Sequence, residues 1–238
     1  MTTTATAASA IDEPDLAEAF RAIVARRRSV RAFEPTPVPE AAIRDVFELA
    51  QWSPSNCNTQ PWAVRIASGA TRDRIAAALL AHIDDGGHQQ GDLPYLRKLY
   101  PSDFKERQVA HILCQQQALG IDRDDKASRM DLLRQQLSFF GAPHVAFLFM
   151  PAWGNEREAS DVGMFAQSLL LGLAAFGLAG LPQTLLGLYA PVVRPLLEVG
   201  EDMKLLFGIS FGYEAKGAPG VRLDQTREPW GTTVRIMA

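Results

Sequence analysis

Six apolar residues follow His144 in the segment HVAFLFM at 144–150. A strand with one face in water alternates apolar and polar residues, whereas a strand that is buried on both faces is apolar at nearly every position. We therefore expect 144–150 to be a central strand of a sheet that other elements cover on both sides. This expectation limits the chain to folds with layers on each face of a sheet.

The rest of the sequence alternates helical and extended patterns in mixed order and contains no internal repeat. We expect Thr71 to cap the third helix, the stretch 84–102 to be rich in turns, and GLAGLPQTLLG at 177–187 to be a loop. The fold class is therefore α+β. Apolar spacing predicts helices at 15–27, 40–52, 71–83, 103–120, 129–139, 157–178 and 191–199, and strands at 62–67, 144–150 and 204–212.

The helix expected at 157–178 is apolar around most of its circumference. Such a helix is either buried in a large core or forms half of a subunit interface. The length of this chain favours the interface, and Leu169 and Leu173 lie one turn apart on a face without polar cover. We expect these two leucines to lie between subunits.

Charge and cysteine content remove several classes of protein. The 24 basic and 27 acidic residues give a formal charge of -3, which indicates neither a nucleic-acid nor a membrane partner. Cys57 and Cys114 lie far apart without metal-ligand spacing, so we expect no metal site, no disulfide and a cytoplasmic location. We expect residues 1–14 to be a disordered tail and 15–238 to be one domain with a variable helical region at about 84–140.

The segment RRRSVRAF at 26–33 places four arginines and a serine where the first helix ends. One interpretation is a solvated basic helix end, which the helix dipole favours. The other is a phosphate site, because guanidinium groups hold phosphate through two parallel hydrogen bonds. The chain has no GxxxxGK[ST] motif and no GxGxxG after a strand, so a phosphorylated ligand would need a different architecture.

A second unusual segment is SPSNCNTQPW at 53–62, which lies between a predicted helix and a predicted strand. Proline favours turns, and Asn, Ser and Thr bond to nearby backbone groups, so this segment is expected to be a shaped polar loop. The loop is either an ordinary connection or part of a binding site.

Five segments in order carry a resemblance: RRSVRAF, SPSNCNTQPW, GLAGLPQTLLG, FGISFGY at 207–213 and QTREPW at 225–230. Together they resemble the FMN-dependent nitroreductase family from about Leu16 onward. The resemblance implies an α+β fold with a mixed sheet flanked by helices. It also implies an interlocked homodimer, with FMN in each of two clefts between the subunits.

The same resemblance implies which residues bind FMN. The first motif would hold the phosphate, ribityl chain and pyrimidine edge, and the second would line the isoalloxazine from the partner subunit. Pro182 would stack on the flavin, with backbone N–H groups near Thr184 and Leu185 at its N5/O4 edge. Gln225 stands where many relatives have lysine. The implied cofactor-binding residues are Arg27, Arg28, Ser29, Arg31, Pro54, Ser55, Asn56, Asn58, Leu181, Pro182, Gln183, Thr184, Leu185, Gln225 and Arg227.

The activity that the resemblance implies is NAD(P)H-dependent reduction of a nitroaromatic or similar electron-poor small molecule by a ping-pong mechanism. No catalytic side chain is required, because the flavin carries the chemistry. Alternatives within the fold are quinone or flavin reduction, dehalogenation, azoline oxidation and flavin fragmentation. An alternative outside enzymes is a flavin-binding or structural dimer without turnover.

Cys57 lies in the second motif without a histidine or other base beside it in sequence, so we expect it to be a small packing residue rather than a nucleophile. Cys57→Ser should therefore retain most of the NAD(P)H-dependent flavin reduction, because transfer of hydride to a flavin needs no thiolate. Rapid-mixing measurement of the reductive half-reaction checks this. A thousandfold slower reduction with FMN still bound would make Cys57 a catalytic residue.

Overall fold

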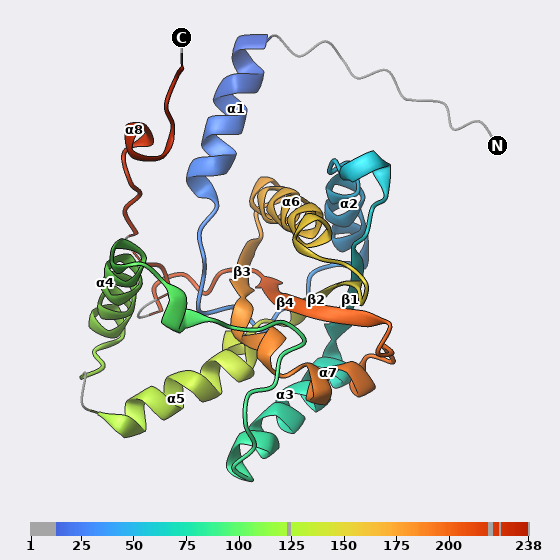
Figure 1. The fold of residues 1–238 in the computed structure, drawn as a ribbon, viewed down its shortest axis with the longest axis vertical. Coiled ribbons are helices and arrows are strands. Elements are labelled where there is room, and N and C mark those ends of the chain that lie inside the picture. Colours follow the sequence, from blue (N-terminus) through green and yellow to red (C-terminus); the bar gives the residue numbers. More distant parts are fainter. Residues whose placement is uncertain (1–12, 123–124, 219–220, 224, 238) are drawn as a thin grey trace, which may run out of the picture.

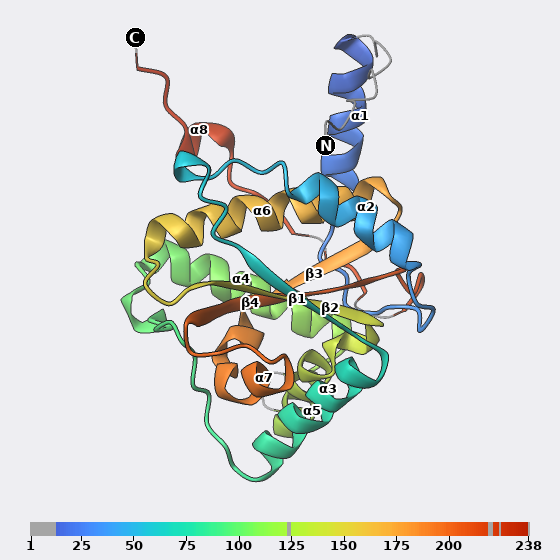
Figure 2. The ribbon, with the colours of Figure 1, turned by 90° about the vertical axis from the view of Figure 1, so that its right-hand side faces the viewer.

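In a computed structural model, the chain folds into a four-stranded sheet between two groups of helices (Figures 1 and 2). The structure describes residues 13–122, 125–218, 221–223 and 225–237, except for the side chains of 13, 14 and 97. The predicted tail lies almost wholly outside these residues, and the first helix begins two residues before its expected start. The elements are α1 (Glu13–Arg26), α2 (Glu40–Ala50), β1 (Ala63–Ser68), α3 (Gly69–Asp84), α4 (Ser102–Leu119), α5 (Lys126–Leu137), β2 (His144–Pro151), α6 (Glu156–Ala175), β3 (Ala179–Gln183), α7 (Ala190–Leu196), β4 (Met203–Gly212) and α8 (Trp230–Thr233).

The strand β2 lies inside the sheet, as its apolar sequence predicts, with strand order β1-β2-β4-β3. Alternate side chains of β2 enter two different cores. Val145, Phe147 and Phe149 belong to the core under α3 and α7. Ala146, Leu148 and Met150 belong to the core under α2 and α6. Each face of the sheet is therefore buried by its own layer of helices, which confirms the α+β class (Figure 2).

The sheet is antiparallel rather than mixed among its four strands. The parallel neighbour is the isolated bridge between Ser29 and Gly180, which attaches the segment after α1 to β3. This bridge brings the first sequence motif alongside the third.

The helix α6 is buried inside its own subunit. Leu169 and Leu173 are 0% and 1% exposed and pack in the core between α6, α2 and the sheet, so placing them between subunits was wrong. The apolar circumference reflects contacts with two neighbours in the same chain, since α6 meets both α2 and the sheet. Its exposed side instead carries Gly163, Met164 and Gln167.

The segment Ala179–Gln183, expected to be part of a loop, forms the edge strand β3 against β4. Pro182 is compatible with a strand at the edge of a sheet, where a missing N–H leaves no central bond unmade. A Cβ on Gly180 would lie 2.8 Å from Leu170 Cδ2 and 3.0 Å from Leu173 Cδ1. Glycine at this position therefore lets α6 pack closely on the strand.

The helix α3 begins earlier than the sequence indicates. Ser68, rather than Thr71, stands at its N-cap, and the Ser68 side chain makes no capping bond. Its hydroxyl lies 2.6 Å from His144 Nδ1. The helix start is thus tied to β2 by a side-chain contact that the local sequence does not reveal.

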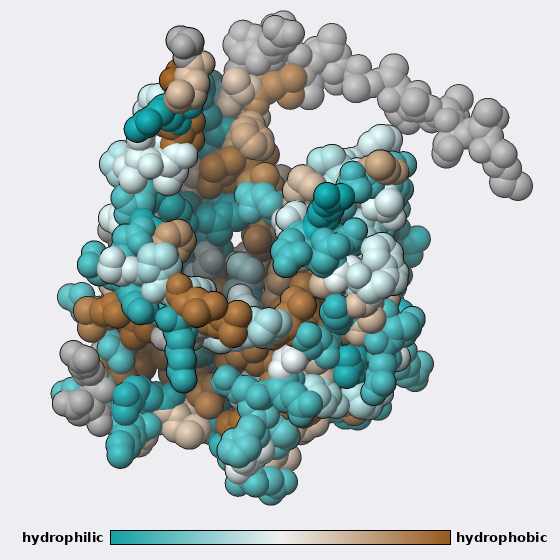
Figure 3. Space-filling view, in the orientation of Figure 1, coloured by the Kyte–Doolittle hydropathy of each residue, from teal (hydrophilic) through white to brown (hydrophobic). Residues whose placement is uncertain are grey.

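Apolar side chains gather on α1, which projects from the body of the molecule (Figures 1 and 3). Leu16, Phe20 and Val24 are 49%, 57% and 44% exposed, and Ile236 at the C-terminal end is 79% exposed. Exposed apolar side chains gathered on one helix, as on α1, are typical of an interaction site. No helix in the described part of the chain is both long and apolar enough to span a bilayer.

His144 is buried, and its Nε2 accepts a hydrogen bond from the Val38 backbone N–H at 2.9 Å. Burial lowers the pKa of His144 below the usual value of about 6.5. The unfolded chain therefore binds this proton first as the pH falls, so the contribution to stability is complete above pH 6.5 and declines below it.

We expect the free energy of unfolding to fall between pH 7.5 and pH 5 in the wild type, and to fall less in His144→Gln, whose amide oxygen accepts without titrating. Urea denaturation at the two pH values measures both. An equal decline in the two proteins would show that His144 is not responsible.

Candidate functional site

The arginine segment leaves α1 as an extended chain held between two other parts of the molecule. Ser29 bridges to Gly180 of β3, and the Arg31 backbone N–H donates to the Val221 carbonyl at 2.9 Å. An extended chain presents successive side chains to opposite sides. Ser29 and Arg31 therefore face one cavity, whereas Val30 faces another, which Arg26 at the end of α1 also lines.

The first cavity, here called the arginine cavity, has a volume of about 490 Å³. It combines residues of the first motif with residues of the C-terminal motif, although about 200 positions separate them in sequence. The sequence-predicted residues that meet there are Arg27, Arg28, Ser29, Arg31, Gln225 and Arg227. It is also lined by four residues that the sequence analysis did not single out, namely Val24, Ala25, His111 and Leu223.

Cations crowd the arginine cavity without a carboxylate among the described residues that line it. Burial, followed by the positive charges of Arg227 and Arg28, lowers the pKa of Arg27. Burial likewise lowers the pKa of Arg31, and Cys114 opposes this shift. An anion in the cavity would relieve the repulsion, and several guanidinium groups with a serine hydroxyl are a donor set that fits a phosphate.

No sequence motif singles out His111, although it lines this cavity. It lies in α4, and its Nδ1 is 3.1 Å from Gln225 Oε1. An isolated histidine in a helical pattern does not indicate a ligand-binding residue. The packing of α4 beside the C-terminal segment is what brings His111 and Gln225 together.

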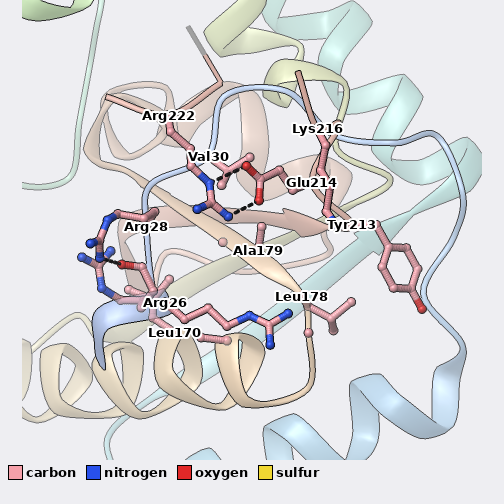
Figure 4. Close-up of a pocket in the computed structure, with 14 residues that line it drawn as sticks. Arg26, Arg28, Val30, Leu170, Leu178, Ala179, Tyr213, Glu214, Lys216 and Arg222 are labelled. Carbon is pink, nitrogen blue, oxygen red and sulfur yellow. Dashed lines mark hydrogen bonds and ion pairs between the residues drawn. The ribbon is translucent and has the colours of Figure 1, made fainter. Parts of the chain in front are cut away.

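The second cavity, here called the Arg26 cavity, has a volume of about 350 Å³ and lies between the arginine segment, the end of α6 and four later residues, Tyr213, Glu214, Lys216 and Arg222 (Figure 4). Arg26 lies along one side of it and the Arg222–Glu214 ion pair along another. Arg27 and Arg28 border both cavities. Unlike the arginine cavity, this one has a carboxylate, Glu214, among its lining residues.

The second motif forms a tight loop with a short 3-10 helix at Asn56–Asn58. Cys57, Asn58 and Gln60 have φ angles of 50°, 56° and 46°, a left-handed conformation that residues other than glycine adopt uncommonly, asparagine more readily than most. The Gln60 backbone N–H donates to Ser55 Oγ at 2.9 Å. The loop is therefore shaped by its own polar side chains, as the sequence predicts.

Asp161 of α6 fixes this loop to the core. It is 4% exposed and accepts a hydrogen bond from the Asn56 backbone N–H at 3.1 Å. The sequence does contain a signal for this role, because an aspartate on the same helical face as Phe165 is an acid on an otherwise apolar surface. The same end of the loop is tied through Ser53 Oγ, which donates to the Ala50 carbonyl at 2.7 Å.

The side chains of the second motif lie on the outside of the subunit, with Pro54, Asn56 and Asn58 exposed and Ser55 partly exposed. None of them lines the arginine cavity in the described part of the chain. Cys57 is also exposed, so the expectation that it is a small packing residue is not met within this subunit. Its left-handed backbone turns it outward with the rest of the loop.

The third motif divides its side chains between the two sides of β3. Pro182 and Thr184 are exposed and Leu185 is partly buried. Leu181 belongs to the core on the α3 side, and Gln183 is 5% exposed, donating to the Gln136 carbonyl at 2.9 Å. Ser210 Oγ donates to Gln183 Oε1. The side chains of Leu181 and Gln183 are therefore committed to the protein interior, which leaves the backbone and Pro182 for a ligand.

The fold places a cluster of cations beside the edge strand β3, an arrangement suited to binding an anion. Residues 24–213 match the model of the nitroreductase family. The chain belongs to this family, which confirms the assignment expected from the five motifs.

Named relatives and solved structures agree over most of the chain. Nitroreductase NfnB of Mycolicibacterium smegmatis is 46% identical over 212 residues, which cover 88% of this chain and 89% of that protein. The 4-nitrobenzoate reductase of Pseudomonas putida is 31% identical over 90% of this chain and 93% of its own length. The crystal structure of the FMN-dependent nitroreductase NfnB from Mycobacterium smegmatis in complex with NADPH superposes with a TM-score of 0.89 at 43% identity, covering 94% of this chain and 100% of that one.

Two neighbouring substitutions should differ in effect, because Arg27 borders the arginine cavity and Arg26 does not. Arg27→Ala should weaken FMN binding by one to two decades, because a charge-assisted hydrogen bond to a phosphate contributes roughly 1.5–3 kcal/mol. Arg26→Ala is the matched control, since Arg26 borders the Arg26 cavity alone. Titration of the apoprotein with FMN, followed by flavin fluorescence, measures both. Equal affinity in the two variants would mean that the arginine cavity does not hold the phosphate.

Proposed function

We propose that this protein is an FMN-dependent oxidoreductase that uses NAD(P)H to reduce nitroaromatic compounds. The observation that carries this proposal is the convergence of Arg27, Arg31 and Arg227 on one cavity without a carboxylate among its described lining residues. Membership of the nitroreductase family supports the proposed reduction of nitroaromatic compounds. The similarity to relatives described as a nitroreductase and a 4-nitrobenzoate reductase supports it as well.

The residues of the arginine cavity suit the FMN phosphate and the parts of the cofactor nearest to it. Arg27 and Arg227 would bind the phosphate, with Arg28 at its edge. The Ser29 hydroxyl would bond to the ribityl chain, and the Arg31 guanidinium, which lies deeper, would meet the pyrimidine edge of the flavin. Bound FMN would supply the transfer of electrons from NAD(P)H to the acceptor.

The chain's own contribution to the reaction is orientation and electrostatics. Pro182 is exposed on β3 and would pack against the flavin ring. The backbone N–H groups of Thr184 and Leu185 would donate toward the N5/O4 edge, where negative charge develops on reduction. No side-chain acid or base is needed for these roles.

We further propose a homodimer in the cytoplasm, with Pro54, Ser55, Asn56 and Asn58 completing the site of the partner subunit. Three features support a shared site: the second motif is held by hydrogen bonds but lies outside the arginine cavity, α1 exposes apolar side chains, and the C-terminal end does the same. The cytoplasm supplies reduced pyridine nucleotides and keeps the thiols of Cys57 and Cys114 reduced.

The direct test is to purify the protein, load it with FMN and follow the flavin absorbance. NADPH or NADH should bleach the flavin, and 4-nitrobenzoate should restore its colour, with steady-state kinetics of the ping-pong form. A quinone and oxygen, tested in parallel, establish which acceptor reoxidises the flavin fastest. A protein that takes up no FMN, or whose bound FMN is not reduced by either nucleotide, would contradict the proposal.

A further inference from the structure

We propose that His111 and Gln225 form a proton-linked part of the phosphate site, in which His111 gains a proton when the FMN phosphate enters. This inference rests on the proposed function and adds to it a binding residue from α4. It also accounts for the neutral Gln225 at a position where relatives were expected to carry lysine.

The hydrogen bond between the two side chains fixes part of the chemistry. Gln225 Oε1 accepts only, so His111 must donate from Nδ1–H across the 3.1 Å contact. The other ring nitrogen, Nε2, then carries either a lone pair or a second proton. With Nε2 protonated, the imidazolium becomes a cation at the wall of the arginine cavity, which His111 lines.

The charges around His111 come from three elements. On α4 itself, Arg107 is paired with Asp103 at 3.1 Å and lies 3.8 Å from Glu228 of the C-terminal segment. Arg107 is therefore largely neutralised. The cations of the arginine cavity have no such partner among its described lining residues. The charged and titratable groups that share a cavity with His111 are Arg27, Arg28, Arg31, Arg107, Cys114, Arg227 and Glu228.

These surroundings predict that FMN binding is coupled to the uptake of a proton by His111. A phosphate monoester carries close to two negative charges near neutral pH, and a negative charge beside an imidazole favours its protonated form. FMN binding should therefore draw a proton from solvent onto His111, and the affinity should rise as the pH falls.

His111→Asn is the matched variant, because the asparagine amide N–H takes the position of Nδ1–H and keeps the bond to Gln225 while removing the titratable nitrogen. Calorimetric titration of the apoprotein with FMN in buffers of different ionisation enthalpy counts the protons taken up. The wild type should take up more protons than His111→Asn, by up to about one per FMN. Its dissociation constant should rise more steeply between pH 6.5 and 8, by up to about tenfold per pH unit.

Riboflavin, which lacks the phosphate, is the control ligand, and the two proteins should bind it with the same proton count. Gln225→Lys restores a fixed cation and should bind FMN at pH 8 more tightly than the wild type, with a weaker pH dependence. Equal proton counts for FMN in wild type and His111→Asn would overturn the inference, as would an equal difference with riboflavin. Failure of the wild type to bind FMN at any pH would instead contradict the proposed function.

Discussion

Electrostatic repulsion among the guanidinium groups of the arginine cavity is the constraint on which the rest of the site depends. Arg27, Arg31 and Arg227 converge on one cavity, and burial holds part of this charge away from water. A protein that only needed a basic surface would leave these side chains spread in solvent. Their convergence is stable when an anion of high charge density occupies the space between them, and a phosphate has the geometry for this.

Packing and backbone contacts of the fold hold these charged side chains close together. A hydrophobic core packs on each face of β2, and β3 forms the edge of the same sheet beside β4. The bridge between Ser29 and Gly180 then fixes the arginine segment to that edge. The same helix, α6, that packs on Gly180 also holds the second motif through Asp161. In each subunit one buried helix thus positions both the arginine segment and the second motif, which are proposed to serve different flavin sites of the dimer.

Much of this arrangement follows from the sequence, because it depends on local pattern. The apolar run at 144–150 predicts an internal strand, and the arginine run predicts a phosphate site as one of two interpretations. The expectations for β3 and for Leu169 and Leu173 were wrong because contacts between distant segments decide the structure there. β3 forms only because β4 offers it a partner, and Leu169 and Leu173 are buried by α2 and the sheet of the same subunit. His111 enters the site through the placement of α4, which no pattern near His111 encodes.

A crystal structure of the protein with FMN bound tests the central claim most directly, because it shows which of the two neighbouring cavities holds the phosphate. We expect the phosphate oxygens to lie within hydrogen-bond distance of Arg27 and Arg227, in the arginine cavity. A phosphate bound instead in the Arg26 cavity, beside Arg26 and Arg222, would contradict the account.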